Sequence, residues 1–249
     1  LRADCREVWA KHFVRFVEAM KGAGVPIWAV SVQNEPEAAQ CWESCIYTAE
    51  EEKVFVRDHL GPALRSTYPE VKIMAWDHNR DGMLERASVM YDDPAAADFL
   101  WGVAYHWYGD ARFETWPPRT EVVFDDRQEG GKVKELKACS GFENVRRLAD
   151  LRPDKHILFT EGCQELGGRE LSSVLHDWKL GERYSMNIIA DINSGCEGWI
   201  DWNLCLDEEG GPNHVGNTCV APVICNTEKG EILYQPSFWH LGHFSRYIR

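Results

Sequence analysis

Two glutamates, each placed at the end of an apolar run, are the residues of this chain whose positions suggest chemistry. Glu35 follows Asn34 and closes the run at residues 27–32, and Glu161 closes a second run at residues 156–160. Such runs, rich in Val and Ile, are typical of strands buried on both faces of a parallel sheet, and catalytic residues gather at the carboxyl ends of these strands. Two carboxyl groups facing one pocket are what glycosidic bond hydrolysis needs, because one donates a proton while the other attacks carbon or activates water.

The elements that must position these glutamates alternate between helices and strands along the chain. We expect further strands over residues 71–76, 102–107 and 196–202, each ending in polar or aromatic residues. The predicted helices cover residues 4–21, 48–67, 83–91, a stretch after 94, 142–151, 182–194 and 237–247, and a hairpin joins 223–226 to 231–234. This alternation predicts βα units on a parallel sheet, as in a (β/α)8 barrel, with a long surface excursion at residues 109–141.

Composition narrows the class of protein. The 249 residues carry 27 Lys and Arg against 40 Asp and Glu, and the net charge of −13 argues against nucleic acid as a partner. No apolar run approaches the roughly 20 residues of a membrane-spanning helix. The nine cysteines form no Cys-x-x-Cys pair, so we expect no structural zinc site. Cys41 with Cys45 and Cys219 with Cys225 are candidate disulfides, and buried free thiols are an equally open alternative.

Several short motifs together resemble one family of enzymes. The chain resembles the clan A retaining glycosidases, and most closely glycoside hydrolase family 30, the glucosylceramidase-like enzymes. The motifs are Gln33-Asn34-Glu35-Pro36, His106-Trp107-Tyr108, Thr160-Glu161-Gly162-Cys163, the segments at residues 198–203 and 210–213, and the stretch at residues 235–245.

The resemblance implies a role for each matched residue. Glu35 would be the acid/base at the end of barrel strand 4, and Glu161 would be the nucleophile at the end of strand 7. The two strands expected between them agree with that numbering. The implied substrate-binding residues are Asn34, His106, Trp107, Tyr108, Trp202 and Asn217. No cofactor and no metal are implied.

The resemblance also implies that part of the barrel lies outside this sequence. If Glu35 ends strand 4, three strands should precede it, yet only one helix does. We therefore expect residues 1–249 to be a single incomplete (β/α)8 domain, strands 4 to 8 with their helices. Strands 1 to 3 and the family's flanking β-sandwich domain would be absent, and the strands ending at Glu35 and Trp202 would be the sheet's open edges.

The expected function is retaining hydrolysis of β-glucosidic bonds by double displacement, on glucosylceramide-type or β-1,6-glucan substrates. A non-catalytic carbohydrate-binding fragment or pseudoenzyme is the first alternative. A metalloenzyme using Asp77, His78 and His106 is a weaker one, and Asp77 and Asp201 read more readily as structural partners. The full-length protein is expected in an extracellular, periplasmic or lysosome-like compartment, although no signal peptide stands in this chain.

Overall fold

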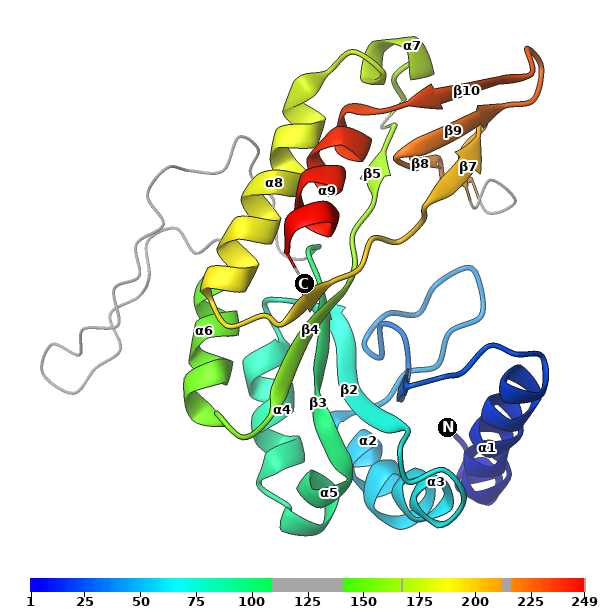
Figure 1. The fold of residues 1–249 in the computed structure, drawn as a ribbon. Helices are drawn as coiled ribbons and strands as arrows, with labels where there is room; N and C mark the ends of the chain where they lie inside the picture. Colours follow the sequence, from blue (N-terminus) through cyan, green and yellow to red (C-terminus); the bar gives the residue numbers. More distant parts are fainter. Residues whose placement is uncertain (109–140, 167, 212–215, 249) are drawn as a thin grey trace, which may run out of the picture. The chain divides into compact units, whose positions relative to one another are not determined.

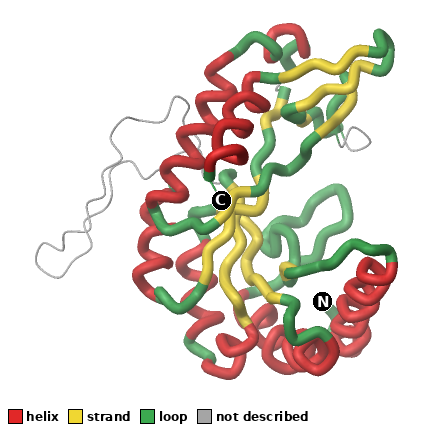
Figure 2. The backbone as a smooth tube through the Cα atoms, viewed as in Figure 1, coloured by secondary structure: helices red, strands yellow, loops and turns green. Residues whose placement is uncertain are grey.

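The computed structural model describes residues 1–108, 141–166, 168–211 and 216–248. The chain divides into two compact units, and each is described by itself. Unit 1 comprises residues 1–106 and 144–159, and unit 2 comprises residues 107–143 and 160–249. The predicted excursion at residues 109–141 lies outside the described residues except for its last position. Figures 1 and 2 show the course of the chain.

A parallel sheet with the order β1-β2-β3-β4-β6 is the framework of the fold, as the sequence predicts. Unit 1 holds its first strands, and β4 ends in Thr160 and Glu161. β4 has the predicted bounds, whereas β6 is far shorter than the expected strand at residues 196–202. The strands are β1 (Ala29–Ser31), β2 (Lys72–Asn79), β3 (Leu100–His106), β4 (His156–Glu161) and β6 (Gly198–Trp199).

The helices of unit 1 follow the strands as expected. Thr48 and Glu51 form a capping box, each satisfying a backbone N–H of the other, which fixes the start of α2. The predicted helix over residues 48–67 is one continuous run that contains a π-helical turn. Figure 1 shows α4 and α5 beside β2 and β3, which they contact. The helices are α1 (Arg6–Gly22), α2 (Ala49–Phe55), the π turn (Val56–Leu60), α3 (Gly61–Thr67), α4 (Met83–Tyr91), α5 (Pro94–Phe99) and α6 (Phe142–Leu151).

Unit 2 pairs two long helices and carries two small sheets. α8 packs against α9, and the predicted hairpin has the expected bounds. β7 extends the hairpin by pairing parallel with β9, and β5 pairs antiparallel with β8. The elements are β5 (Gln164–Glu165), α7 (Leu171–Val174), α8 (Trp178–Asn193), β7 (Cys205–Asp207), β8 (Cys219–Val220), β9 (Val223–Asn226), β10 (Glu231–Tyr234) and α9 (Pro236–Tyr247).

The strand that leads to Glu35 is less buried than predicted. β1 lies at the edge of the sheet, and β2 is its partner among the described strands. All three of its residues are half-buried, and Trp28 just before it is 53% exposed. The expectation of burial on both faces was therefore wrong for β1, because such burial needs packed layers on both faces of the sheet and the three residues of β1 are only partly covered. Its place at an edge was predicted correctly.

A buried carboxyl group anchors β2 to the helix before it. Glu52 of α2 is fully buried and accepts a hydrogen bond from the backbone N–H of Trp76, at 3.0 Å. The buried Arg86 guanidinium lies 3.5 Å from the other carboxyl oxygen of Glu52. Burial raises the pKa of Glu52 to about 7, against the lowering influence of Arg86 and the Trp76 N–H. Ionising this group in the folded protein is therefore costly.

This raised pKa predicts that stability falls as the pH rises. In the unfolded chain Glu52 loses its proton near pH 4.5, whereas the folded protein holds it to about pH 7. Between these values the folded state binds more protons, so the free energy of unfolding decreases with pH, by up to about 3 kcal/mol for this group. Urea unfolding of the wild type at pH 5 and pH 7.5 should show the fall, and Glu52→Gln should reduce it. Equal pH dependence in the two proteins would contradict this explanation.

The cysteines group differently from the two candidate disulfides. Cys41 and Cys45 are not joined by a disulfide bond. Cys219 lies beside Cys163, with 2.7 Å between the sulfur atoms, and Cys225 lies beside Cys205, at 3.2 Å. Of the two alternatives left open, the candidate disulfide between Cys219 and Cys225 does not form, because β8 pairs with β5 near Cys163, whereas β9 pairs with β7 at Cys205. In the described part of the chain, the helices are too short or too polar to cross a membrane.

Candidate active site

Glu35 stands in the turn that follows β1, with a backbone conformation that is rare for its residue type. Its φ is +48°, in the left-handed region, and its backbone N–H donates to the carbonyl oxygen of Asp77 at 2.9 Å. A non-glycine residue held there costs on the order of 1 kcal/mol or more, and such strain clusters at functional sites. Its side chain is 13% exposed, so the carboxyl group is largely enclosed yet reachable.

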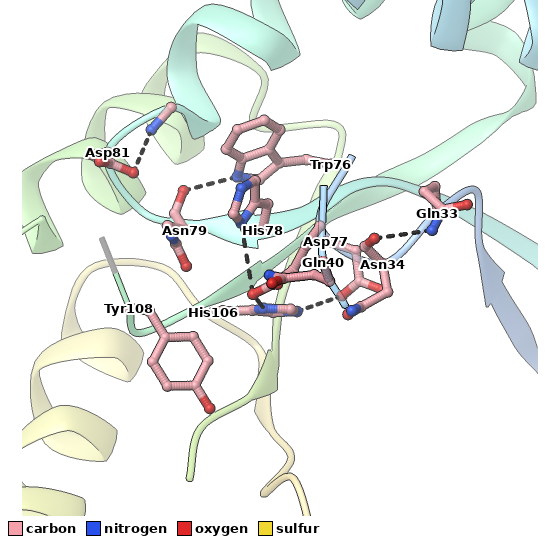
Figure 3. Close-up of polar contacts among 12 residues, drawn as sticks. Gln33, Asn34, Gln40, Trp76, Asp77, His78, Asn79, Asp81, His106 and Tyr108 are labelled. Atoms are coloured by element: carbon pink, nitrogen blue, oxygen red, sulfur yellow. Dashed lines mark hydrogen bonds and ion pairs between the residues drawn. The ribbon is translucent and has the colours of Figure 1, made fainter. Parts of the chain in front are cut away.

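Three side chains of unit 1 surround the Glu35 carboxyl group, and Figure 3 labels them as Gln40, His78 and His106. The Gln40 amide donates to Oε2 at 2.9 Å, and His106 Nδ1 lies 3.3 Å from Oε1. His78 Nδ1 approaches Oε1 to 3.8 Å. The carboxyl group is therefore fixed in orientation, which is what a group transferring a proton at a defined atom requires.

An irregularity in β2 brings two consecutive side chains to this carboxyl group. The register between β2 and β3 shifts between Trp76 and His78, and both Trp76 and Asp77 have positive φ, of 76° and 51°. In a regular strand, neighbouring side chains point to opposite faces, whereas a bulge re-aims one of them. Asp77 and His78 consequently both reach the cluster around Glu35.

His106 connects Glu35 to a second carboxylate. The ring is buried, with 1% of the side chain exposed, and its Nε2 lies 3.1 Å from Asp77 Oδ1. Ser31 of β1 donates its hydroxyl proton to the other oxygen of Asp77. These contacts run from Ser31 through Asp77 and His106 to Glu35, and they fix the orientation of the Glu35 carboxyl group. Direct contact of His106 with a sugar stays a prediction.

The surroundings set the charge state of Glu35. Burial is the largest influence and raises the pKa of Glu35, but the hydrogen bonds from His106 and Gln40 and the nearby imidazoles lower it more. The resulting pKa of Glu35 lies below its ordinary value. Burial lowers the pKa of His78, only partly offset by the Glu35 carboxylate. Unit 1 alone therefore favours the ionised form of Glu35.

The second glutamate stands at the end of β4, in unit 2. Glu161 is half-buried, and its backbone oxygen accepts a hydrogen bond from the Trp107 N–H at 3.4 Å. Tyr108, which follows Trp107 in the chain, donates its hydroxyl proton to Cys163 Sγ at 3.0 Å. Burial is the main cause of a strongly raised pKa at Tyr108, so the phenol stays protonated. Tyr108 therefore lies beside the strand end that carries Glu161, and its contact with a sugar stays a prediction.

The other predicted residues of unit 2 differ in their surroundings. Trp107 is 2% exposed and packs edge-on against Tyr184 and Trp199, so this ring belongs to an aromatic cluster in the structure. Trp202 is half-buried and its backbone N–H donates to Gly162, one residue past Glu161. Asn217 accepts the Cys219 thiol proton at 3.2 Å. Sugar binding by these residues stays a prediction.

One residue of the site, Gln40, carries no signal in the sequence, and another, His78, was predicted only as a possible metal ligand. Gln40 lies in an irregular loop, where no periodic pattern distinguishes it. His78 entered the analysis only as part of a metal site, although its place after an apolar run is the same signal that identified Glu35. Asn34, expected to bind a sugar hydroxyl, is exposed beside Glu35.

Comparison with known proteins gives this geometry a context. The model of the glycosyl hydrolase family 30 TIM-barrel domain matches residues 3–126 and 140–248. The chain belongs to this family. Mouse lysosomal acid glucosylceramidase is 34% identical over 97% of this chain and 43% of its own length.

Two solved structures agree with the assignment. SrfJ from Salmonella typhimurium has a TM-score of 0.81 at 34% identity, over 100% of this chain and 49% of its own. The endo-β1,6-glucanase BT3312 has a TM-score of 0.75 at 30% identity, over 98% of this chain and 48% of its own. The chain therefore spans slightly less than half the length of these three relatives.

Proposed function

We propose that this chain carries the catalytic residues of a retaining β-glucosidase, with Glu35 as acid/base and Glu161 as nucleophile. The observation that carries the proposal is the Glu35 cluster, a strained strand-end carboxyl group with three fixed partners in a family 30 chain. Glu161 ends β4, and β2 and β3 intervene in the sheet order, as the family pattern requires.

Glu35 would have two tasks in double displacement, and Glu161 would form the bond to the sugar that the second step breaks. Glu161 attacks the anomeric carbon while Glu35 protonates the departing oxygen, and Glu35 then removes a proton from the water that releases the sugar. The lowered pKa of Glu35 suits the second task, in which it acts as a base. For the first task its pKa must rise, and a second carboxylate about 5–5.5 Å away, the separation typical of retaining enzymes, would raise it.

The proposed substrates are β-glucosides of the glucosylceramide type or β-1,6-glucans. Named relatives support both, a lysosomal glucosylceramidase and an endo-β1,6-glucanase. We also propose an acidic, lysosome-like or extracellular compartment for the full-length protein. The pKa values of the buried Glu52 and of the half-buried Asp201 are each raised to about 7, mainly by loss of solvation, and this favours the fold at acid pH.

We further propose that residues 1–249 form strands 4 to 8 of the barrel and that activity needs the other strands. On its own the chain is expected to associate, because β1 presents an edge with the exposed Trp28 beside it, and to show at most about 1% of normal turnover. Size-exclusion chromatography and an aryl β-glucoside assay measure these outcomes. A monomer with full glycosidase activity would contradict this proposal.

The test of function uses a completed protein, in which the parts of SrfJ flanking the matched segment are joined to both ends of this chain. NMR should show that the first sugar released from an aryl β-glucoside has the β configuration, and glucosylceramide and β-1,6-glucan would be compared as substrates. Release of the α anomer would exclude a nucleophilic role for Glu161. Binding of glucan without turnover would favour the carbohydrate-binding alternative.

A further inference from the structure

Three side chains around Glu35 have the identity and spacing of a metal site. Among the described residues, one ligand atom each from Glu35, His78 and His106 lies within 4.8 Å of the other two. Glu35 Oε1 is 3.3 Å from His106 Nδ1 and 3.8 Å from His78 Nδ1. Ligands at 2.0–2.2 Å in a tetrahedral zinc site lie about 3.3 Å from one another. Small side-chain movements would therefore close these three atoms around one ion.

The contacts of His106 favour a cation at its Nδ1. Both ring nitrogens face carboxylate oxygens, Asp77 Oδ1 at 3.1 Å and Glu35 Oε1 at 3.3 Å. A neutral imidazole carries one proton, so it can donate to only one of them. Without a metal, a proton on Nδ1 donates to Glu35. A cation that binds between Nδ1 and Glu35 Oε1 would displace that proton and bond to both atoms, while a proton on Nε2 would donate to Asp77.

Two further features are typical of metal sites, a carboxylate that orients a ligand histidine and a buried ligand nitrogen without a hydrogen-bond partner. The Asp77 carboxylate on the far nitrogen of His106 forms the carboxylate–histidine arrangement that orients metal-bound imidazoles. Ser31 in turn holds Asp77 (Figure 3 shows the Asp77, His78 and His106 side chains together). His78 Nδ1 is buried without a hydrogen-bond partner among the described residues, and the His78 ring packs on Trp76.

The chemical types of the three ligands indicate which metal ion the site would bind. Two imidazole nitrogens and one carboxylate oxygen suit zinc and similar transition metals, whereas calcium and magnesium prefer oxygen ligands alone. Three protein ligands leave the fourth position of a tetrahedral ion for water. The two carboxylates, Glu35 and Asp77, supply negative charge next to the ion.

We propose that Glu35, His78 and His106 bind one Zn²⁺ ion, and that the bound ion inhibits the enzyme by occupying the oxygen of Glu35 that would carry the proton. The binding site stands on the geometry alone, and the inhibition rests on the proposed function. Zinc would thus act as a reversible inhibitor rather than as a cofactor.

Binding is tested by titrating Zn²⁺ into the 249-residue chain, fused to a soluble carrier without metal sites and with its thiols alkylated. Calorimetry should show one tight site, and Co²⁺ in its place should give the intense visible bands of a four-coordinate ion. His78→Gln should weaken binding on the order of 100-fold, and Asp77→Asn about 10–100-fold. His12→Gln, which removes an exposed histidine of the same unit, should change nothing.

The proposed zinc site would be contradicted if the wild type, His78→Gln and Asp77→Asn bound zinc with equal affinity. Circular dichroism would confirm that both variants are folded. Loss of the site in His12→Gln would also contradict the proposed zinc site. In the completed protein, Zn²⁺ should inhibit the wild type, EDTA should reverse the inhibition, and His78→Gln should require about 100-fold more zinc relative to its own zinc-free rate. Tight binding at the cluster without inhibition would instead contradict the acid/base role of Glu35, so failure of the site and failure of the proposed function are distinguishable.

Discussion

Glu161→Gln in the completed protein is expected to lower kcat on the order of 10⁴-fold or more on every β-glucoside. The amide has nearly the shape of the carboxylate but cannot attack the anomeric carbon, so no glycosyl-enzyme forms. The loss should not depend on the leaving group, because both halves of the reaction pass through the bond to Glu161. Initial rates with aryl glucosides of different leaving-group acidity measure this.

Glu165→Gln is the matched control for this variant. Glu165 is an exposed carboxylate four residues along the chain, in β5, so its rates should match those of the wild type. Turnover of more than a few per cent in Glu161→Gln, with the fold intact, would show that another group is the nucleophile.

Glu35→Ala is expected to have an effect that depends on the substrate. With a poor leaving group, such as an alkyl alcohol or a second sugar, kcat/KM should fall about 10²–10⁴-fold, the usual contribution of general acid catalysis. With a dinitrophenyl glucoside the first step should be nearly unchanged, because that leaving group departs without a proton. The second step should then limit the rate, since no base activates the water.

Rescue by azide distinguishes the acid/base residue from the nucleophile. In Glu35→Ala azide should restore turnover of the dinitrophenyl glucoside and give β-glucosyl azide, since it attacks the glycosyl-enzyme without needing a base. Glu37→Ala, at an exposed glutamate two residues away, should be unaffected by azide. If azide instead rescued the Glu161 variant and gave the α product, the two roles would be reversed.

The sequence predicted the frame of this fold well. The apolar run that ends in Glu161 gave the bounds of β4, because a buried parallel strand leaves a continuous apolar pattern. The run before Glu35 located β1, but that strand is only half-buried and ends at Ser31, before Glu35. The hairpin and the helix at Met83–Tyr91 were placed with the observed bounds. The edge position of β1 was also predicted, but from the family resemblance rather than from its residues.

The details of the site could not be predicted because distant contacts set them. The bulge at Asp77 depends on Trp76, whose backbone N–H is held by Glu52 of α2 and whose indole donates to the Asn79 carbonyl. No local sequence pattern predicts a positive φ at Trp76 or Asp77. Gln40 reaches Glu35 from an irregular loop, and the pairing of Cys163 with Cys219 follows from β5 meeting β8, two strands too short to leave a pattern.

Covalent trapping tests the central claim most directly. The completed protein would be incubated with 2,4-dinitrophenyl 2-deoxy-2-fluoro-β-glucoside, which forms the glycosyl-enzyme quickly and releases it slowly. One label per chain is expected, with peptide mass spectrometry placing it on Glu161, and the same label is expected in Glu35→Ala. A label on any other residue, or normal turnover of ordinary substrates with no label formed, would contradict the nucleophilic role of Glu161.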